Sequence, residues 1–84
     1  MQAVAISLNH EILHYQAEFE LFGHSFIFEF QWLEKEAYRL LHIYDIAGQP
    51  LALGLKLIPR WPLFRYRNIE LMMLENTLIA YEII

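Results

Sequence analysis

Several residue types that stabilise or punctuate small domains are scarce in this chain. Its 84 residues include no cysteine, three glycines and three prolines. Without cysteine, neither a disulfide nor a thiolate metal site can reinforce the fold. No segment approaches the roughly 18 consecutive apolar residues of a transmembrane helix, and the start lacks the basic and apolar regions of a signal peptide. The sequence therefore predicts one soluble, non-secreted domain spanning residues 1–84.

Motifs for phosphate binding and nucleophilic catalysis are also missing. The chain has no GxxxxGK[ST] and no GxGxxG segment, and neither Ser7 nor Ser25 lies in a GxSxG setting. His10 and His14 are four residues apart and could supply two metal ligands from one helix, but no third ligand and no HExxH pattern accompany them. Polar residues on a loop and a strand edge also explain this pair, and we expect no metal site.

Three glutamates are the remaining candidates for acid–base chemistry. Glu18, Glu20 and Glu29 fall on facing strands, and paired carboxylates with separated pKa values are a sign of such catalysis. They alternate with apolar residues, however, as the solvated face of a strand does. His42 shares a strand face with Tyr44, where a hydrogen-bonded structural histidine is the usual case. We therefore expect neither an enzyme nor a cofactor.

The composition indicates a protein that associates with others. Hydrophobic residues make up 57% of the chain, above the roughly 45–50% of typical globular chains. A domain of this size buries only about 60–65% of the surface of its unfolded chain, so part of this apolar surface should be exposed in a monomer. The net charge of −4 disfavours broad nucleic-acid binding. Burial against partner proteins is the role that this composition favours.

Alternation of polar and apolar residues dominates the middle of the chain and predicts antiparallel hairpins. Phenylalanine or tryptophan at every second position from Phe26 to Trp32 is typical of a strand, because successive side chains point to opposite faces. A first hairpin is predicted from 15–21 and 25–32 around Gly23, and a second from 38–46 and 51–58. In the latter, Leu51, Leu53, Leu55 and Leu57 are predicted to share one face, and Gly54 suggests a bulge. Two further strands are predicted at 69–74 and 77–84.

The chain ends are less regular, and two alternatives stay open there. Residues 1–14 are predicted to form an extended arm, although Asn9 could instead cap a short helix over residues 10–16. Met72, Met73 and Leu74 could also be helical. The predicted fold class is all-β: a small antiparallel barrel or sandwich of about five to seven strands built from hairpins.

The turn between residues 45 and 50 has a recognisable chemistry. Asp45 can accept hydrogen bonds from backbone N–H groups ahead of it, Gly48 supplies a left-handed position, and Pro50 starts a strand without needing to donate. Pro59 and Pro62 then interrupt the strand pattern and force extended backbone before each of them. These five residues are predicted to be structural.

The segment around the last two prolines is the best candidate for a contact site. It brings aromatic and cationic residues together on irregular backbone, and three functions fit. It could stack and bind single-stranded nucleic acid, it could close one end of the core, or it could anchor a partner protein, because Trp, Tyr and Arg dominate binding hot spots. The predicted partner contacts are Arg60, Trp61, Phe64, Arg65 and Tyr66.

A longer motif combines these turn and proline residues with an upstream hairpin. The upstream part is an alternating strand, a turn at Gly23 and an aromatic strand that ends at Trp32. The motif residues that follow are Ile43-Tyr44-Asp45, Gly48, Pro50-Leu51, Gly54, Leu57, Pro59, Trp61-Pro62-Leu63 and Arg65-Tyr66. Over about residues 6–68 this pattern resembles the baseplate plug proteins of tailed phages, a family first characterised in a cyanophage.

The resemblance implies a non-catalytic structural subunit of a contractile tail baseplate, at the junction of hub, spike and tail tube. It implies no cofactor, a place in the virion, and residence in the bacterial host cytoplasm during assembly, encoded by a phage or a prophage. Hub, spike and tube proteins are the implied partners, with no membrane contact, and a trimer is expected by analogy. Single-stranded nucleic-acid binding is the alternative that the residues leave open.

Overall fold

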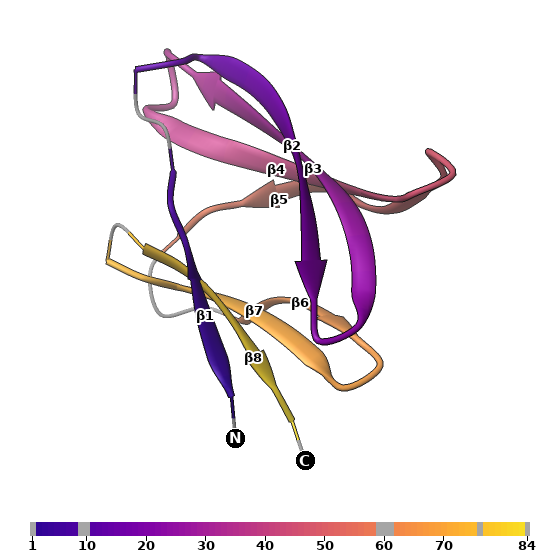
Figure 1. Ribbon diagram of the computed structural model, residues 1–84. Helices are drawn as coiled ribbons and strands as arrows, with labels where there is room; N and C mark the ends of the chain where they lie inside the picture. The colour runs from indigo at the N-terminus through magenta and orange to yellow at the C-terminus, as the bar shows by residue number, and fades with distance from the viewer. Residues whose placement is uncertain (1, 9–10, 59–61, 76, 84) are drawn as a thin grey trace.

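Eight strands form two four-stranded antiparallel sheets in the computed structural model, which describes residues 2–8, 11–58, 62–75 and 77–83 (Figure 1). The first sheet has the order β2-β3-β4-β5 and the second the order β1-β8-β7-β6. The strands are β1 (Ala3–Ile6), β2 (His14–Leu21), β3 (His24–Leu33), β4 (Tyr38–Asp45), β5 (Pro50–Lys56), β6 (Pro62–Tyr66), β7 (Ile69–Leu74) and β8 (Thr77–Glu82).

The predicted all-β class is confirmed, and the architecture is sandwich-like. Among the described residues no ladder joins β5 to β6 or β1 to β2, so the sheets do not close into a barrel. The strand number exceeds the predicted range because β1 forms within the predicted arm and β6 forms directly after the segment 59–61. β1 pairs with β8, which brings the two chain ends side by side (Figure 1).

Aromatic residues of β3 form the centre of the core. Phe26, Phe28 and Phe30 are at most 2% exposed, and they face the second sheet, whose buried residues in the described ranges are Ile6, Ile69, Leu71, Met73, Leu78 and Ala80. The Phe28 ring lies 5.1 Å from the Phe19 ring and 6.1 Å from the Phe30 ring, between centroids. Because each fully buried phenylalanine contributes about 1.5–3 kcal/mol, this row stabilises the sandwich strongly.

The first hairpin follows the predicted alternation. All eight residues of β2 pair in continuous register with β3, from His14 opposite Gln31 to Leu21 opposite His24. The two residues between them, Phe22 and Gly23, both have positive φ (52° and 85°). Positive φ at both central positions defines the type I′ turn, whose twist matches that of the flanking strands.

A bulge in β5 changes the face on which its leucines lie. Leu41 pairs with Leu55 but Ile43 pairs with Ala52, so β5 has an extra residue at this point. Gly54 there has φ +72°, which confirms the predicted bulge. The prediction that the four leucines share a face is wrong, because the bulge leaves Leu53 58% exposed while Leu57 is 7% exposed.

Both helical alternatives are wrong in the described residues. Residues 14–16 belong to β2 and residues 72–74 to β7. In β7 the alternate residues Ile69, Leu71 and Met73 are buried, and burial of every second residue requires a strand. Burial of one face of β7 in the core overrides the weak helical preference of the two methionines.

Candidate partner-binding surface

The turn that precedes β5 is held by its aspartate. One carboxylate oxygen of Asp45 accepts hydrogen bonds from the backbone N–H groups of Ala47 (3.0 Å) and Gln49 (2.8 Å). The backbone N–H of Gly48 donates to the Asp45 carbonyl at 2.9 Å, and Gly48 has φ +87°. Pro50 is the first residue of β5. The turn projects away from the second sheet (Figure 1).

The aromatic residues of β6 face the core. Phe64 and Tyr66 are partly buried and pack against it. The Tyr66 ring meets Phe26 edge-on at 5.5 Å and Phe64 in a stacked arrangement at 6.3 Å. The Arg67 guanidinium lies over the same ring at 5.5 Å. Tyr66 therefore has little surface left on which a base could stack, which weighs against the nucleic-acid alternative.

Arg65 has the opposite orientation to its two aromatic neighbours. It is exposed on the outer face of the second sheet, directly opposite Glu70 on β7. Of the predicted contact residues that the structure describes, Arg65 is the one presented to solvent. Pro59, Arg60 and Trp61 lie outside the described residues, and their predicted roles stay predictions.

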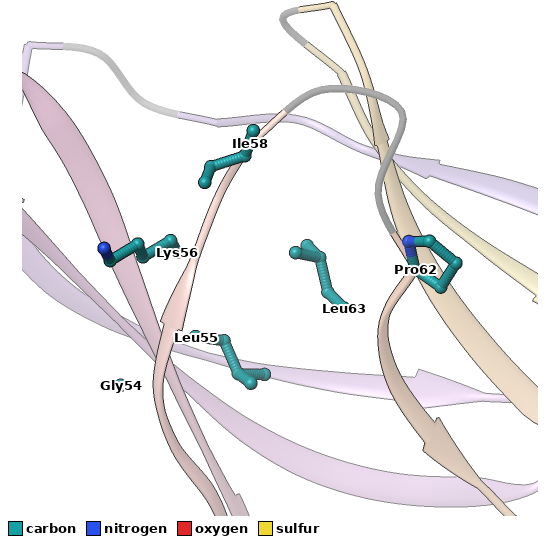
Figure 2. Close-up of a pocket in the computed structure, with 6 residues that line it drawn as sticks. All are labelled: Gly54, Leu55, Lys56, Ile58, Pro62 and Leu63. Carbon is teal, nitrogen blue, oxygen red and sulfur yellow. The ribbon is translucent and has the colours of Figure 1, made fainter.

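An apolar cavity of about 310 Å³ lies between β5 and β6 (Figure 2). The two strands are not hydrogen-bonded to each other, so side chains line the gap between the sheets at this side. The Leu55 and Leu63 side chains both lie in the space between the strands (Figure 2). The cavity is lined by Gly54, Leu55, Lys56, Ile58, Pro62 and Leu63. A cavity of this size could receive one or two apolar side chains of a partner.

Exposed apolar side chains lie at several places around the sandwich. Among the described residues, seven large apolar side chains are more than 40% exposed: Val4, Ile12, Leu13, Ile46, Leu53, Ile58 and Leu74. Three of these lie on or near β5: Ile46 in the turn before it, Leu53 within it and Ile58 two residues after its end. The exposure of Leu53 could not be predicted from the alternation of the sequence, because it results from the bulge in β5.

Comparison with known protein families identifies the family of this chain. The model of the family described as Cyanophage baseplate Pam3 plug gp18 matches residues 3–82, nearly the whole chain. The chain belongs to this baseplate plug family. No curated protein and no solved structure matches it significantly. The family resemblance predicted from the residues 43–66 motif is confirmed.

Family membership settles the class of function. This plug protein is a structural component of a phage tail baseplate, located in the virion, and its family is not an enzyme family. Its partners are other baseplate proteins. Within the described ranges no three His, Asp or Glu side chains are placed to hold a metal ion. The described residues also contain no helix long and apolar enough to cross a membrane.

Polar side chains on the outer face of the first sheet link three strands of the plug protein. Glu29 on β3 interacts with His14 Nε2 on β2 at 2.5 Å and accepts a hydrogen bond from the Tyr44 hydroxyl on β4 at 2.9 Å. The hydrogen bond from His14, followed by that from Tyr44, lowers the pKa of Glu29. The same Tyr44–Glu29 bond raises the pKa of Tyr44.

His42 is a structural histidine, as predicted. Its Nδ1 accepts a hydrogen bond from the backbone N–H of Gly54 at 3.0 Å. Because Nδ1 accepts, the ring proton is on Nε2, which lies 3.3 Å from the Gln31 side-chain oxygen. His42 thereby satisfies a backbone group that the β5 bulge removes from the ladder.

Proposed function

We propose that this plug protein sits at the junction of hub, spike and tail tube of a contractile tail, and that it binds these neighbours through apolar side chains. The family match over residues 3–82 is the observation that carries the proposal. The exposed apolar residues support it, because isolated apolar surface on so small a domain is stabilised when a partner covers it. A trimer and a prophage origin remain predictions.

The size of the molecule also supports a role in assembly. Its accessible surface is 5494 Å², and a specific interface covers about 800 Å² of each partner. Two such interfaces would cover about three tenths of the plug protein. A thin sandwich, 18 Å across its shortest axis, can therefore contact neighbours on more than one side at once.

The proposed contact region is the cavity between β5 and β6 with its rim. Ile58 is 46% exposed, Pro62 is exposed, and Arg65 presents its cation on the next outward position of β6. An apolar cavity bordered by β6, together with an exposed arginine on the same strand, combines apolar and cationic surface as binding hot spots do. Arg60 and Trp61 belong to the same chain segment and are predicted to extend this contact.

Co-purification from cells that express the plug protein with the hub, spike and tube proteins of its phage tests the proposal. The wild-type protein should be recovered with at least one of them. The double variant Ile58→Ser, Arg65→Ala should be recovered at least about tenfold less. A matched variant away from the cavity, with Ile46→Ser in the β4–β5 turn and Arg67→Ala in the β6–β7 turn, should be recovered like the wild type. Failure of the wild-type protein to bind any of the three contradicts the proposed location.

Trp61→Ala separates the two predicted roles of that residue. A large fall in melting temperature would show that the indole belongs to the core. A normal melting temperature with lost co-purification would show that it contacts a partner. If neither quantity changes, both predictions for Trp61 are wrong.

A further inference from the structure

The four edge strands of the sandwich differ in how they are protected against pairing with another chain. β1 has only four residues, β6 has five and starts at Pro62, and β5 starts at Pro50 and contains the Gly54 bulge. Short length, proline, bulges and charged side chains are the usual devices that protect an edge. β2 has eight residues, no proline, no glycine and no register shift. It is the one regular, full-length edge among the described strands.

The hairpin geometry fixes which backbone groups of β2 point outward. In a hairpin with a two-residue turn, the residues that flank the turn exchange backbone hydrogen bonds, and every second residue does the same. Leu21 and His24 flank this turn, and the carbonyl of Leu13 accepts from Trp32 at the other end. Residues of odd number therefore bond to β3. The N–H and C=O groups of Gln16, Glu18 and Glu20 point away from the sheet.

The side chains of these outward residues indicate the chemistry of a partner. Gln16, Glu18 and Glu20 are all exposed on the outer face of the first sheet. In a strand added beside β2, the residues opposite the two glutamates would lie at alternate positions, about 5 Å away across the ladder. Lysine or arginine at those positions would neutralise both carboxylates.

We propose that β2 receives an extended strand of another baseplate protein, with lysine or arginine at alternate positions, as a fifth strand of the first sheet. This inference rests on the proposed function, because it names the chemistry of one baseplate partner. Backbone hydrogen bonds would supply affinity and the opposite charges would supply specificity. A second copy of β2 fits less well, since it would bring four glutamates to one seam.

A peptide titration tests the edge itself. The probe is an N-acetylated and C-amidated peptide of about eight residues that alternates lysine and valine, and its control alternates glutamate and valine. With the basic peptide, hydrogen exchange at the amides of Gln16, Glu18 and Glu20 should slow at least about tenfold. Exchange at Ala17 and Phe19, already bonded to β3, should stay unchanged. Equal binding of both peptides, or no protection at the even-numbered amides, would overturn the inference.

Variants give a second, independent readout. Glu18→Pro removes one outward N–H, which an edge strand tolerates, and should abolish peptide binding while leaving the melting temperature nearly unchanged. If this variant fails to fold, Glu18→Gln with Glu20→Gln replaces it and should weaken binding at least about tenfold. The matched control, Glu34→Gln with Glu36→Gln in the β3–β4 turn, should bind like the wild type.

Co-purification with the hub, spike and tube proteins separates this inference from the proposed function. Loss of one partner by the β2 variants alone supports the inference. Variants that retain every partner overturn it and leave the proposed location intact. Light scattering gives one further test. If the wild-type protein forms concentration-dependent dimers and the β2 variants do not, the inference is also overturned, because the β2 edge would then pair with a second copy of this chain.

Discussion

Truncation of Tyr66 to alanine tests whether the aromatic residues of β6 belong to the core. Residues 64–66 were predicted as partner contacts. In the structure, Phe64 and Tyr66 lie on the core side of β6 and Arg65 lies on its solvent side. The Tyr66 ring packs against Phe26 and Phe64, and Arg65 points outward. Tyr66→Ala should therefore lower stability, whereas Arg65→Ala should not.

The magnitude follows from the degree of burial. Truncation of a fully buried large aromatic residue costs about 3–5 kcal/mol, and Tyr66 is only partly buried. We therefore expect Tyr66→Ala to lower the free energy of unfolding by about 2 kcal/mol. This figure includes the edge-on contact with Phe26, because an aromatic pair of this kind contributes about 0.5–1.5 kcal/mol. For a domain of this size each kcal/mol lowers the melting temperature by about 4–8 °C, so the expected fall is about 8–16 °C. Arg65→Ala should cost less than about 0.5 kcal/mol.

Thermal and urea unfolding followed by circular dichroism measure both variants against the wild type. Tyr66→Phe is the control, since it keeps the ring and removes only the hydroxyl, and it should melt close to the wild type. A Tyr66→Ala protein that melts within about 2 °C of the wild type would refute the core assignment, since a change that small corresponds to less than about 0.5 kcal/mol. The ring would then be available to a partner, as the sequence predicted.

Two further predictions concern the first sheet. Asp45→Ala should lower the free energy of unfolding by about 1–2 kcal/mol, because two backbone N–H groups lose their acceptor. Urea unfolding measures this change, and the Asp45→Asn variant should be more stable than Asp45→Ala. The lowered pKa of Glu29 means that its contribution to stability is present above the ordinary value of 4.5 and disappears as the pH falls through the lower folded value. Glu29→Gln should therefore flatten the loss of stability below about pH 4.5 and should lower the phenol pKa of Tyr44, measured by ultraviolet titration. An unchanged Tyr44 titration would contradict the hydrogen bond, and Glu18→Gln is the control.

Local sequence patterns predicted much of the first sheet. Alternating aromatic residues in β3, the positive-φ glycine of its turn and the Asp45 turn chemistry each act between residues close in the chain. Their strands are consequently placed within one or two residues of their observed bounds in β2, β3 and β4. The outward position of Leu53 escaped this reasoning, because the amount by which a bulge shifts the register depends on the neighbouring strand.

The sequence by itself determined that this chain is all-β, hairpin-built and a member of the plug family, since alternation and turn residues act locally and the family motif is linear. Only the tertiary structure decided three further points. Part of the predicted arm forms an edge strand paired with β8, Phe64 and Tyr66 face the core while Arg65 faces solvent, and β2 is the one regular, full-length edge among the described strands. Each of these depends on which strands meet across the two sheets. Pairing such as Ala3 opposite Tyr81 joins residues at the two ends of the chain, so no local pattern specifies it.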